Sequence, residues 1–232
     1  MFIQVDLNIG SARYFPDGPF RKAEARRSVK MFHVPKGVEG MVLDSAVPDF
    51  LVTDAIVARY LEIRPPRFRV TTTFDLIISE IERAFVLGQF FAAVAASVVS
   101  VERMLNDARI RLHQHASPKL KDLWGKGPLN EWAGNIDALQ KWGYLQTALA
   151  DELKAVFDIR CRYLHSAAIT EPEEDARRCV GAAFSLLTEF IGFPERLFRL
   201  GGSIECLDTT DPLFEVFYKP ALSDTTGQQP AG

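Results

Sequence analysis

The sequence has few cysteines and no excess of positive charge. Its three cysteines show no paired spacing of the kind that binds metal, so we expect no metal site, and we expect no cofactor. An odd number of cysteines without an evident leader fits a reducing compartment, which predicts a cytoplasmic protein. The formal net charge of −3 argues against a protein that coats nucleic acid unselectively, because such binding must neutralise many phosphates.

The sequence also lacks an uninterrupted apolar run that would cross a membrane. The longest run without charge, residues 84–101, approaches the length of a membrane span. Gly88-Gln89 interrupts this run, and Ser97 and Ser100 lie in what remains. We therefore predict two packed helices that meet at a turn, and no membrane partner.

Residues 1–72 show short and mixed patterns, which predict a small α/β segment. Apolar and polar side chains alternate over residues 1–8, as in a strand, and residues 29–34 could return as its partner strand. The spacing over residues 49–63 suits a helix, which we prefer, although the β-branched content would also suit a strand. The prolines of Arg64–Arg67 break any regular element, and we place a domain boundary after them.

A basic stretch lies inside this segment. Residues 13–36 contain seven basic residues and only two acidic ones. One interpretation is a phosphate-facing patch that contacts RNA through Arg26 and Arg27. The alternative, which we favour, is a solvated face, because no aromatic residues interleave to form a stacking platform. The seven basic residues are Arg13, Arg21, Lys22, Arg26, Arg27, Lys30 and Lys36.

From residue 73 the apolar spacing becomes helical, and four helices are predicted up to residue 200. The first two have continuous apolar stripes, the third spans residues 145–164, and Thr170-Glu171-Pro172-Glu173 predicts a capping box before the fourth. Residues 113–143 form a long irregular connection, in which His113 and His115 lack the neighbours of a metal site. We therefore predict a mainly α fold, an antiparallel four-helix bundle over residues 73–200. The stripes are Phe74, Ile77, Ile78, Ile81 and Phe85, then Phe91, Val94, Val98, Val101, Leu105, Ala108 and Leu112.

Residues 201–232 are predicted to form a C-terminal extension. Apolar and polar residues partly alternate over residues 213–218, which could add a strand to a sheet or to a partner. After Pro220 the composition is that of a disordered tail.

One arginine falls where the third predicted helix should carry an apolar residue. Leu149, Leu153 and Val156 mark one helix face, and Arg160 follows four residues after Val156. A guanidinium on such a face requires a carboxylate, a subunit contact or a site, since arginine is rarely buried alone. The alternative is an arginine that snorkels or forms a structural pair.

His165 follows Arg160 after four intervening residues, between two predicted bundle helices. This arrangement resembles the signature of HEPN domains, small all-α proteins that include many metal-independent ribonucleases. The segment 158–165 is similar to the family's arginine, asparagine, any three, histidine form, with Cys161 where asparagine is usual. Residues 101–105 also resemble the leucine, glutamate, any, leucine, leucine stretch of the family's second helix, which places Glu102 in the motif.

The resemblance implies a homodimer in which the arginine and histidine of both protomers line a cleft at a twofold axis. It also implies a reaction in which an RNA 2′-hydroxyl attacks its own phosphate. His165 would act as general acid or base and Arg160 would stabilise the phosphoryl charge. Glu102 would orient either side chain, unless it forms an ordinary surface pair. Arg162 and Arg103, with Arg26 and Arg27, are further candidate RNA contacts.

Positions five apart on a continuous helix differ by about 140°, so Arg160 and His165 would not share a face. Either the helix ends near Leu164, or each residue works with a copy from the partner. The leading hypothesis is a HEPN-like ribonuclease in a defence or toxin setting, with an antitoxin or restriction-system partner. A catalytically silent HEPN-like dimer that serves as an interaction module is the alternative, and a bundle unrelated to HEPN is the third possibility.

Overall fold

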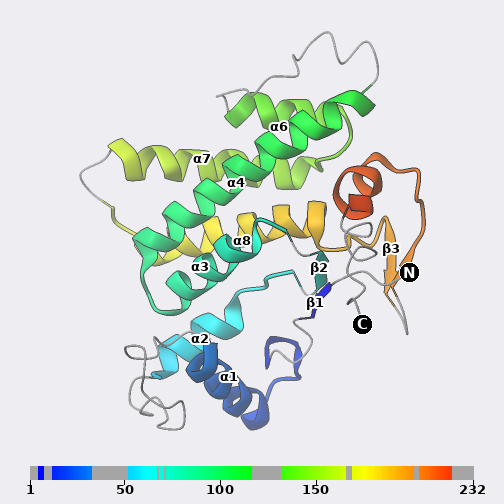
Figure 1. Cartoon of the computed structure of the whole chain (residues 1–232). Helices are drawn as coiled ribbons and strands as arrows, with labels where there is room; N and C mark the ends of the chain where they lie inside the picture. Colours follow the sequence, from blue (N-terminus) through cyan, green and yellow to red (C-terminus); the bar gives the residue numbers. More distant parts are fainter. Residues whose placement is uncertain are drawn as a thin grey trace, which may run out of the picture.

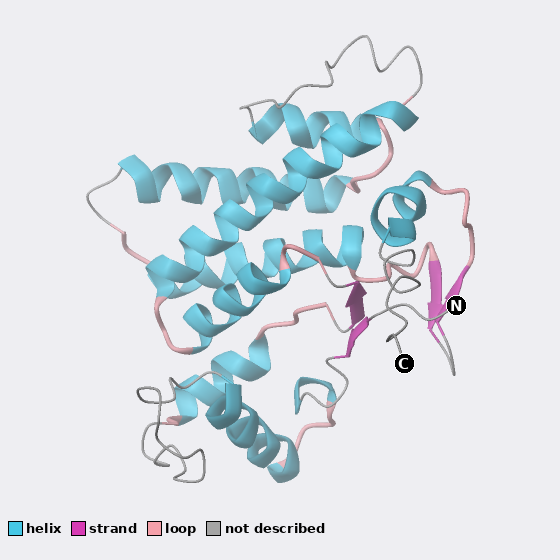
Figure 2. Cartoon of the chain, in the orientation of Figure 1, coloured by secondary structure: helices cyan, strands magenta, loops and turns pink. Residues whose placement is uncertain are grey.

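The structure is a computed structural model that describes residues 5–7, 12–32, 52–66, 68–70, 72–116, 132–165, 169–200 and 204–220. Helices dominate this part of the chain, and the strands are short (Figure 2). The prediction of a mainly α fold is confirmed.

Helix α4 (Phe90–Leu112) is the element around which the other helices pack. It contacts four helices, which are α3 (Asp75–Val86), α6 (Trp132–Lys141), α7 (Thr147–His165) and α8 (Pro172–Ile191). In Figure 1 it runs obliquely across α7 and α8. Its apolar stripe is buried from Val94 to Leu112 as predicted, because residues three and four apart share one face. Phe91 is the exception, since its side chain is 62% exposed.

The N-terminal segment combines one two-stranded sheet with two helices. Strand β1 (Val5–Leu7) pairs antiparallel with β2 (Phe68–Val70). The predicted return strand at residues 29–34 is wrong over residues 29–32, which lie in α1 (Pro19–Phe32), and residues 33–34 lie outside the described residues. Ala25 and Val29, four residues apart, are both fully buried, so the helical period prevails over the β-branched content.

Helix α2 (Asp54–Glu62) resolves the conflicting pattern over residues 49–63 in favour of a helix. Thr53 is its N-cap and accepts a hydrogen bond from the Ile56 backbone N–H at 3.4 Å. Val57 and Tyr60 are buried, and the chain leaves the helix before Pro65.

The predicted capping box before α8 is wrong. The N-cap is Glu171 rather than Thr170, and its side chain makes no capping hydrogen bond. Pro172 occupies the first turn, where its fixed φ is already helical, and it constrains Glu171 to a non-helical conformation. The apolar residues of α8 that follow one another at intervals of three and four face inward, with Ala176, Val180, Phe184, Leu187 and Ile191 all buried.

The C-terminal extension differs most from the expectation. Residues 213–218 do not form a strand, because Phe214–Tyr218 is a five-residue π-helix (η5) flanked by helical turns. All six residues except Glu215 are buried, and a wide helix can bury aromatic rings on more than one side. A hairpin of β3 (Phe198–Leu200) and β4 (Ile204–Cys206) precedes it and was not predicted. The predicted tail after Pro220 lies outside the described residues.

In the described residues of the connection between α4 and α7 lie the 3₁₀ turn η4 (His113–His115) and helix α6. Trp132 docks α6 onto α7, since its indole N–H donates to the Leu153 carbonyl at 3.1 Å. No helix within the described ranges is long and apolar enough to cross a membrane.

Candidate functional site

Arg160 lies at the edge of the buried face of α7. The buried stripe of this helix is Ala150, Leu153, Val156 and Ile159, so Ile159 occupies the inward position that the spacing assigned to Arg160. The Arg160 side chain is 31% exposed. A step of three turns the helix by about 60° and a step of four by about 40°, so helix phase alone does not separate Ile159 from Arg160.

Glu102 of α4 faces Arg160 across the α4–α7 contact. The Arg160 Nη2 and Glu102 Oε2 atoms lie 3.9 Å apart, which makes an ion pair but not a hydrogen bond. The Arg160 guanidinium also lies 5.8 Å from the centre of the Phe157 ring. An ion pair this long and this exposed contributes under about 1 kcal/mol, so most guanidinium donors stay available to a ligand.

The two side chains line a cleft between α4 and α7 of about 220 Å³, which we name the Arg160 cleft. Three of its apolar side chains are unusually exposed, Phe91 at 62%, Val99 at 47% and Leu164 at 60%. The other lining residues are Ala95, Val98 and Tyr163. A charged pair thus lies within a largely apolar surface of the kind that marks an interaction site.

Tyr163 adds a polar group that sequence reasoning missed. Its ring stacks on that of Phe91 with 5.7 Å between centroids, while its hydroxyl is buried without a hydrogen-bond partner among the described residues. Burial, assisted by the nearby Asp175 carboxylate, raises the pKa of Tyr163 to about 12. The phenol therefore stays neutral and retains an unused O–H donor. A tyrosine at this spacing carries no sequence signal beyond that of a packing residue.

His165 is the last residue of α7 and is exposed. The helix therefore reaches the end of the motif, and the offset of about 140° from Arg160 applies. His165 does not line the Arg160 cleft. The structure brings Glu102 and Arg160 together and leaves His165 on another face of the same helix.

The four predicted RNA contacts fall into two groups. Arg162 pairs with Asp175, and Arg26 pairs with Asp54 at 2.6 Å between Nη2 and Oδ1. Arg103 and Arg27 form no ion pair or hydrogen bond within the described ranges.

The rest of the basic stretch is largely committed to structure. The Arg13 side chain is only 1% exposed and pairs with Glu82, and Arg21 pairs with Asp17. These contacts leave little of the predicted patch free, and Lys36 lies outside the described residues.

In the described part of the chain, no group of three or more histidine, cysteine, aspartate or glutamate side chains is placed to hold a metal ion. Comparison with family models, with curated proteins and with solved structures finds no match for this chain. The resemblance to HEPN domains therefore depends on the residues of the motif, of which Arg160 and Glu102 meet at the α4–α7 contact and His165 does not.

Proposed function

We propose that this protein is a HEPN-like RNA endonuclease that acts as a homodimer. In this proposal α3, α4, α7 and α8 form the family's four-helix bundle, and the Arg160 cleft is half of the reaction site. The observation that carries the proposal is the Arg160–Glu102 pair, because the two motif residues come from separate helices and still meet in a solvent-accessible cleft.

The proposed RNA cleavage needs a group that transfers a proton and a cation that stabilises negative charge on the phosphate. His165 takes the proton of the RNA 2′-hydroxyl as that oxygen bonds to the adjacent phosphorus, the bond from phosphorus to the 5′-oxygen breaks, and the proton passes to the leaving 5′-oxygen. Charge accumulates on the phosphoryl oxygens during this step. Arg160 stabilises it, since its guanidinium donors are not consumed by Glu102. Glu102 orients the guanidinium in the cleft.

A partner protomer completes the site. Within one protomer His165 points away from the face that carries Arg160, so a catalytic pair needs the histidine of one protomer and the arginine of the other. The exposed apolar side chains Phe91, Val99 and Leu164 provide the surface that the partner covers. A toxin or defence setting, with an antitoxin or restriction-system partner, is the context in which such an enzyme would act.

A catalytically silent dimeric module is the second candidate. Two observations favour it, namely Cys161 in place of the family's asparagine and the apolar character of the Arg160 cleft. In that case the cleft serves the dimer contact alone, and Arg160 acts as an interface residue.

RNA cleavage in EDTA separates the two candidates. Arg160→Ala and His165→Ala should each lower the cleavage rate by about 10² to 10⁴, because each removes a group that acts on the reacting phosphate. Products should end in 2′,3′-cyclic phosphates, and Cys161→Asn should preserve or raise the rate. Arg178→Ala is the matched control, since it removes an exposed arginine that pairs with Glu152. An inactive wild-type protein would favour the silent module, and an unfolded Arg160→Ala protein would make the guanidinium structural.

Mixing the two inactive variants tests the composite site. A heterodimer of Arg160→Ala and His165→Ala protomers contains one site with both groups intact if the site spans two protomers, and none if it lies within one. Random reassociation makes half of the dimers mixed, so about a quarter of the wild-type activity should return. Activity that stays absent after proven subunit exchange would contradict the composite site.

A further inference from the structure

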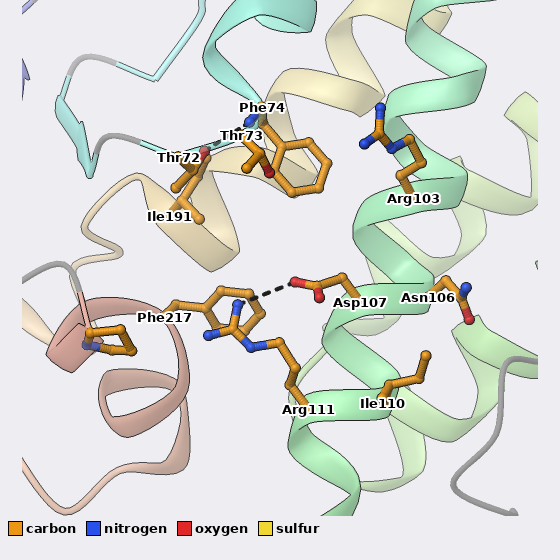
Figure 3. Close-up of a pocket in the computed structure, with 11 residues that line it drawn as sticks. Thr72, Thr73, Phe74, Arg103, Asn106, Asp107, Ile110, Arg111, Ile191 and Phe217 are labelled. Carbon is orange, nitrogen blue, oxygen red and sulfur yellow. Dashed lines mark hydrogen bonds and ion pairs between the residues drawn. The ribbon is translucent and has the colours of Figure 1, made fainter.

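A second cleft lies against a neighbouring face of α4, and the proposed RNA chemistry does not use it. Figure 3 shows Arg103, Asp107 and Arg111 on this face, opposite Phe74 before α3 and Phe217 of η5. The three α4 residues follow one another at intervals of four, so they line one side of the helix. The cleft has a volume of about 520 Å³, within the range of small-molecule sites, and we name it the Arg103 cleft.

Of the two arginines that line the Arg103 cleft, one is paired with a carboxylate among the described residues and the other is not. Arg111 is held in place, because its Nη1 lies 3.3 Å from Asp107 Oδ2, its Nη2 donates to the Val216 carbonyl, and its guanidinium lies 4.7 Å from the Phe217 ring centre. Arg103 makes no ion pair or hydrogen bond with any described residue. One uncompensated cation therefore lines the cleft, beside an aspartate that is only partly neutralised.

Hydroxyl groups lie across from Arg103. Thr72 Oγ1 accepts a hydrogen bond from the Phe74 backbone N–H at 3.1 Å, which leaves its O–H free to donate. Thr73 is exposed and also lines the cleft (Figure 3). A guanidinium and hydroxyl donors around one space suit a phosphate group.

Two unusual backbone conformations lie at or next to the part of the cleft that Ile191 and Phe217 line. Phe217 belongs to the π-helix, and Ile191, at the end of α8, is followed two residues later by Phe193 with a φ of 58°. The left-handed region is costly for a phenylalanine, and its N–H is fixed on the Tyr218 hydroxyl at 3.2 Å. Both features occur often at functional sites, where they set the position of a wall at the expense of stability.

We propose that the Arg103 cleft binds a small organic phosphate that carries hydroxyl groups. Arg103 and the threonine hydroxyls bind the phosphate. Asp107 accepts hydrogen bonds from the hydroxyls of the ligand, since Arg111 contacts one of its oxygens and a carboxylate has several acceptor positions. Sugar phosphates and nucleoside monophosphates share this chemistry.

Calorimetric titration of the full chain with inorganic phosphate, ribose 5-phosphate and AMP tests the proposal. Ribose 5-phosphate and AMP should bind more tightly than inorganic phosphate, because only they carry sugar hydroxyls that can reach Asp107 while the phosphate contacts Arg103. Arg103→Gln should raise the dissociation constants of all three ligands by about tenfold or more, because a charge-assisted contact with the phosphate is lost. Asp107→Asn should reduce the difference in affinity between ribose 5-phosphate and inorganic phosphate, because the amide is a weaker acceptor for the sugar hydroxyls than the carboxylate. Arg27→Gln is the matched control, since it removes an exposed, unpaired arginine from α1.

The relative affinities of the three ligands distinguish the kinds of site. Tighter binding of AMP than of ribose 5-phosphate would support a nucleotide site, and equal binding would support a sugar-phosphate site. No binding of any of the three at millimolar concentration, or an equal loss in Arg27→Gln, would overturn the proposal. The titration contains no RNA, so its result is independent of the proposed cleavage.

Discussion

Arg13 shows how a residue from a basic stretch becomes part of the core. Its Nη2 pairs with Glu82 Oε1 at 2.5 Å, its Nε donates to the Tyr60 carbonyl at 2.7 Å, and its guanidinium lies 3.7 Å from the centre of the Tyr60 ring. The partners come from α3 and α2, up to 69 residues away. Contacts between residues so far apart in the chain cannot be predicted from the local sequence. The sequence therefore predicted only a basic stretch.

Replacing Arg13 with alanine should lower the free energy of unfolding by roughly 3 kcal/mol. The change removes the Arg13 guanidinium from the largely buried Glu82 carboxylate, and removing one partner of a buried pair is costly. Urea unfolding measures the change. Arg27→Ala, at an exposed position, should stay within about 0.5 kcal/mol of the wild type. Similar midpoints for the two variants would contradict a structural role for Arg13.

At the candidate site, reasoning from residue spacing was partly sufficient. An arginine beside the apolar face of α7 implied a carboxylate opposite, and Glu102 lies there. The inward position was assigned one residue too late, because Ile159 rather than Arg160 is buried. Tyr163 and the Arg103 cleft depend on which helices meet, and the spacing within one helix does not contain that information.

At the scale of elements, long periodic segments could be predicted, whereas several short elements, among them η5, β2 and the β3–β4 hairpin, could not. Helices α3, α4, α7 and α8 have apolar residues at intervals of three and four over three or more turns, which fixes both type and inward face. Residues 213–218 are too short for such a pattern, and their alternation suits a strand as well as a π-helix. Burial of the aromatic rings against Phe190 and Phe193 decided the outcome.

The partner of β1 was assigned incorrectly for a related reason. Residues 29–32 are too few to show a helical period, which becomes visible only with the fully buried pair Ala25 and Val29. The true partner, β2, follows Pro65-Pro66, whose restricted backbone delivers an extended chain to the sheet. A three-residue strand carries almost no pattern, so its pairing is a property of the folded chain.

The join between α8 and η5 gives a prediction at this scale. Tyr218→Phe should lower the free energy of unfolding by about 1–3 kcal/mol, since the buried Phe193 N–H then loses its acceptor. Burial raises the pKa of Tyr218 above its ordinary value, so the hydroxyl stays protonated and the effect should not vary between pH 6 and 9. Tyr163→Phe is the matched control. It removes a buried hydroxyl without a partner among the described residues, so it should be neutral or stabilising. A loss in the control as large as that in Tyr218→Phe would contradict this account.

At the scale of the whole molecule, α4 presents two clefts on different faces. The Arg160 cleft is mostly apolar and edged by exposed rings and aliphatic groups, whereas the Arg103 cleft contains unpaired and paired charges. A largely apolar surface around one charged pair suits a protein partner, and polar groups around a pocket suit a small ligand. The net charge of −3 fits this division, because a nucleic acid would have to bind at a local cationic group rather than over a whole face.

The dimer is the prediction that both functional candidates share. The wild-type protein should sediment as a dimer at micromolar concentration, and Leu164→Asp should sediment as a monomer with unchanged helical content. Burial of a leucine contributes about 1.5–3 kcal/mol, and a twofold axis doubles the loss, so the dissociation constant should rise more than about 100-fold. Leu76→Asp is the matched control, because Leu76 is 75% exposed on α3 and does not line the Arg160 cleft. A monomeric wild-type protein would remove the composite site, since His165 and Arg160 of one protomer lie on different faces of α7. A Leu164→Asp protein that stays dimeric would instead place the contact elsewhere and leave the Arg160 cleft open to solvent.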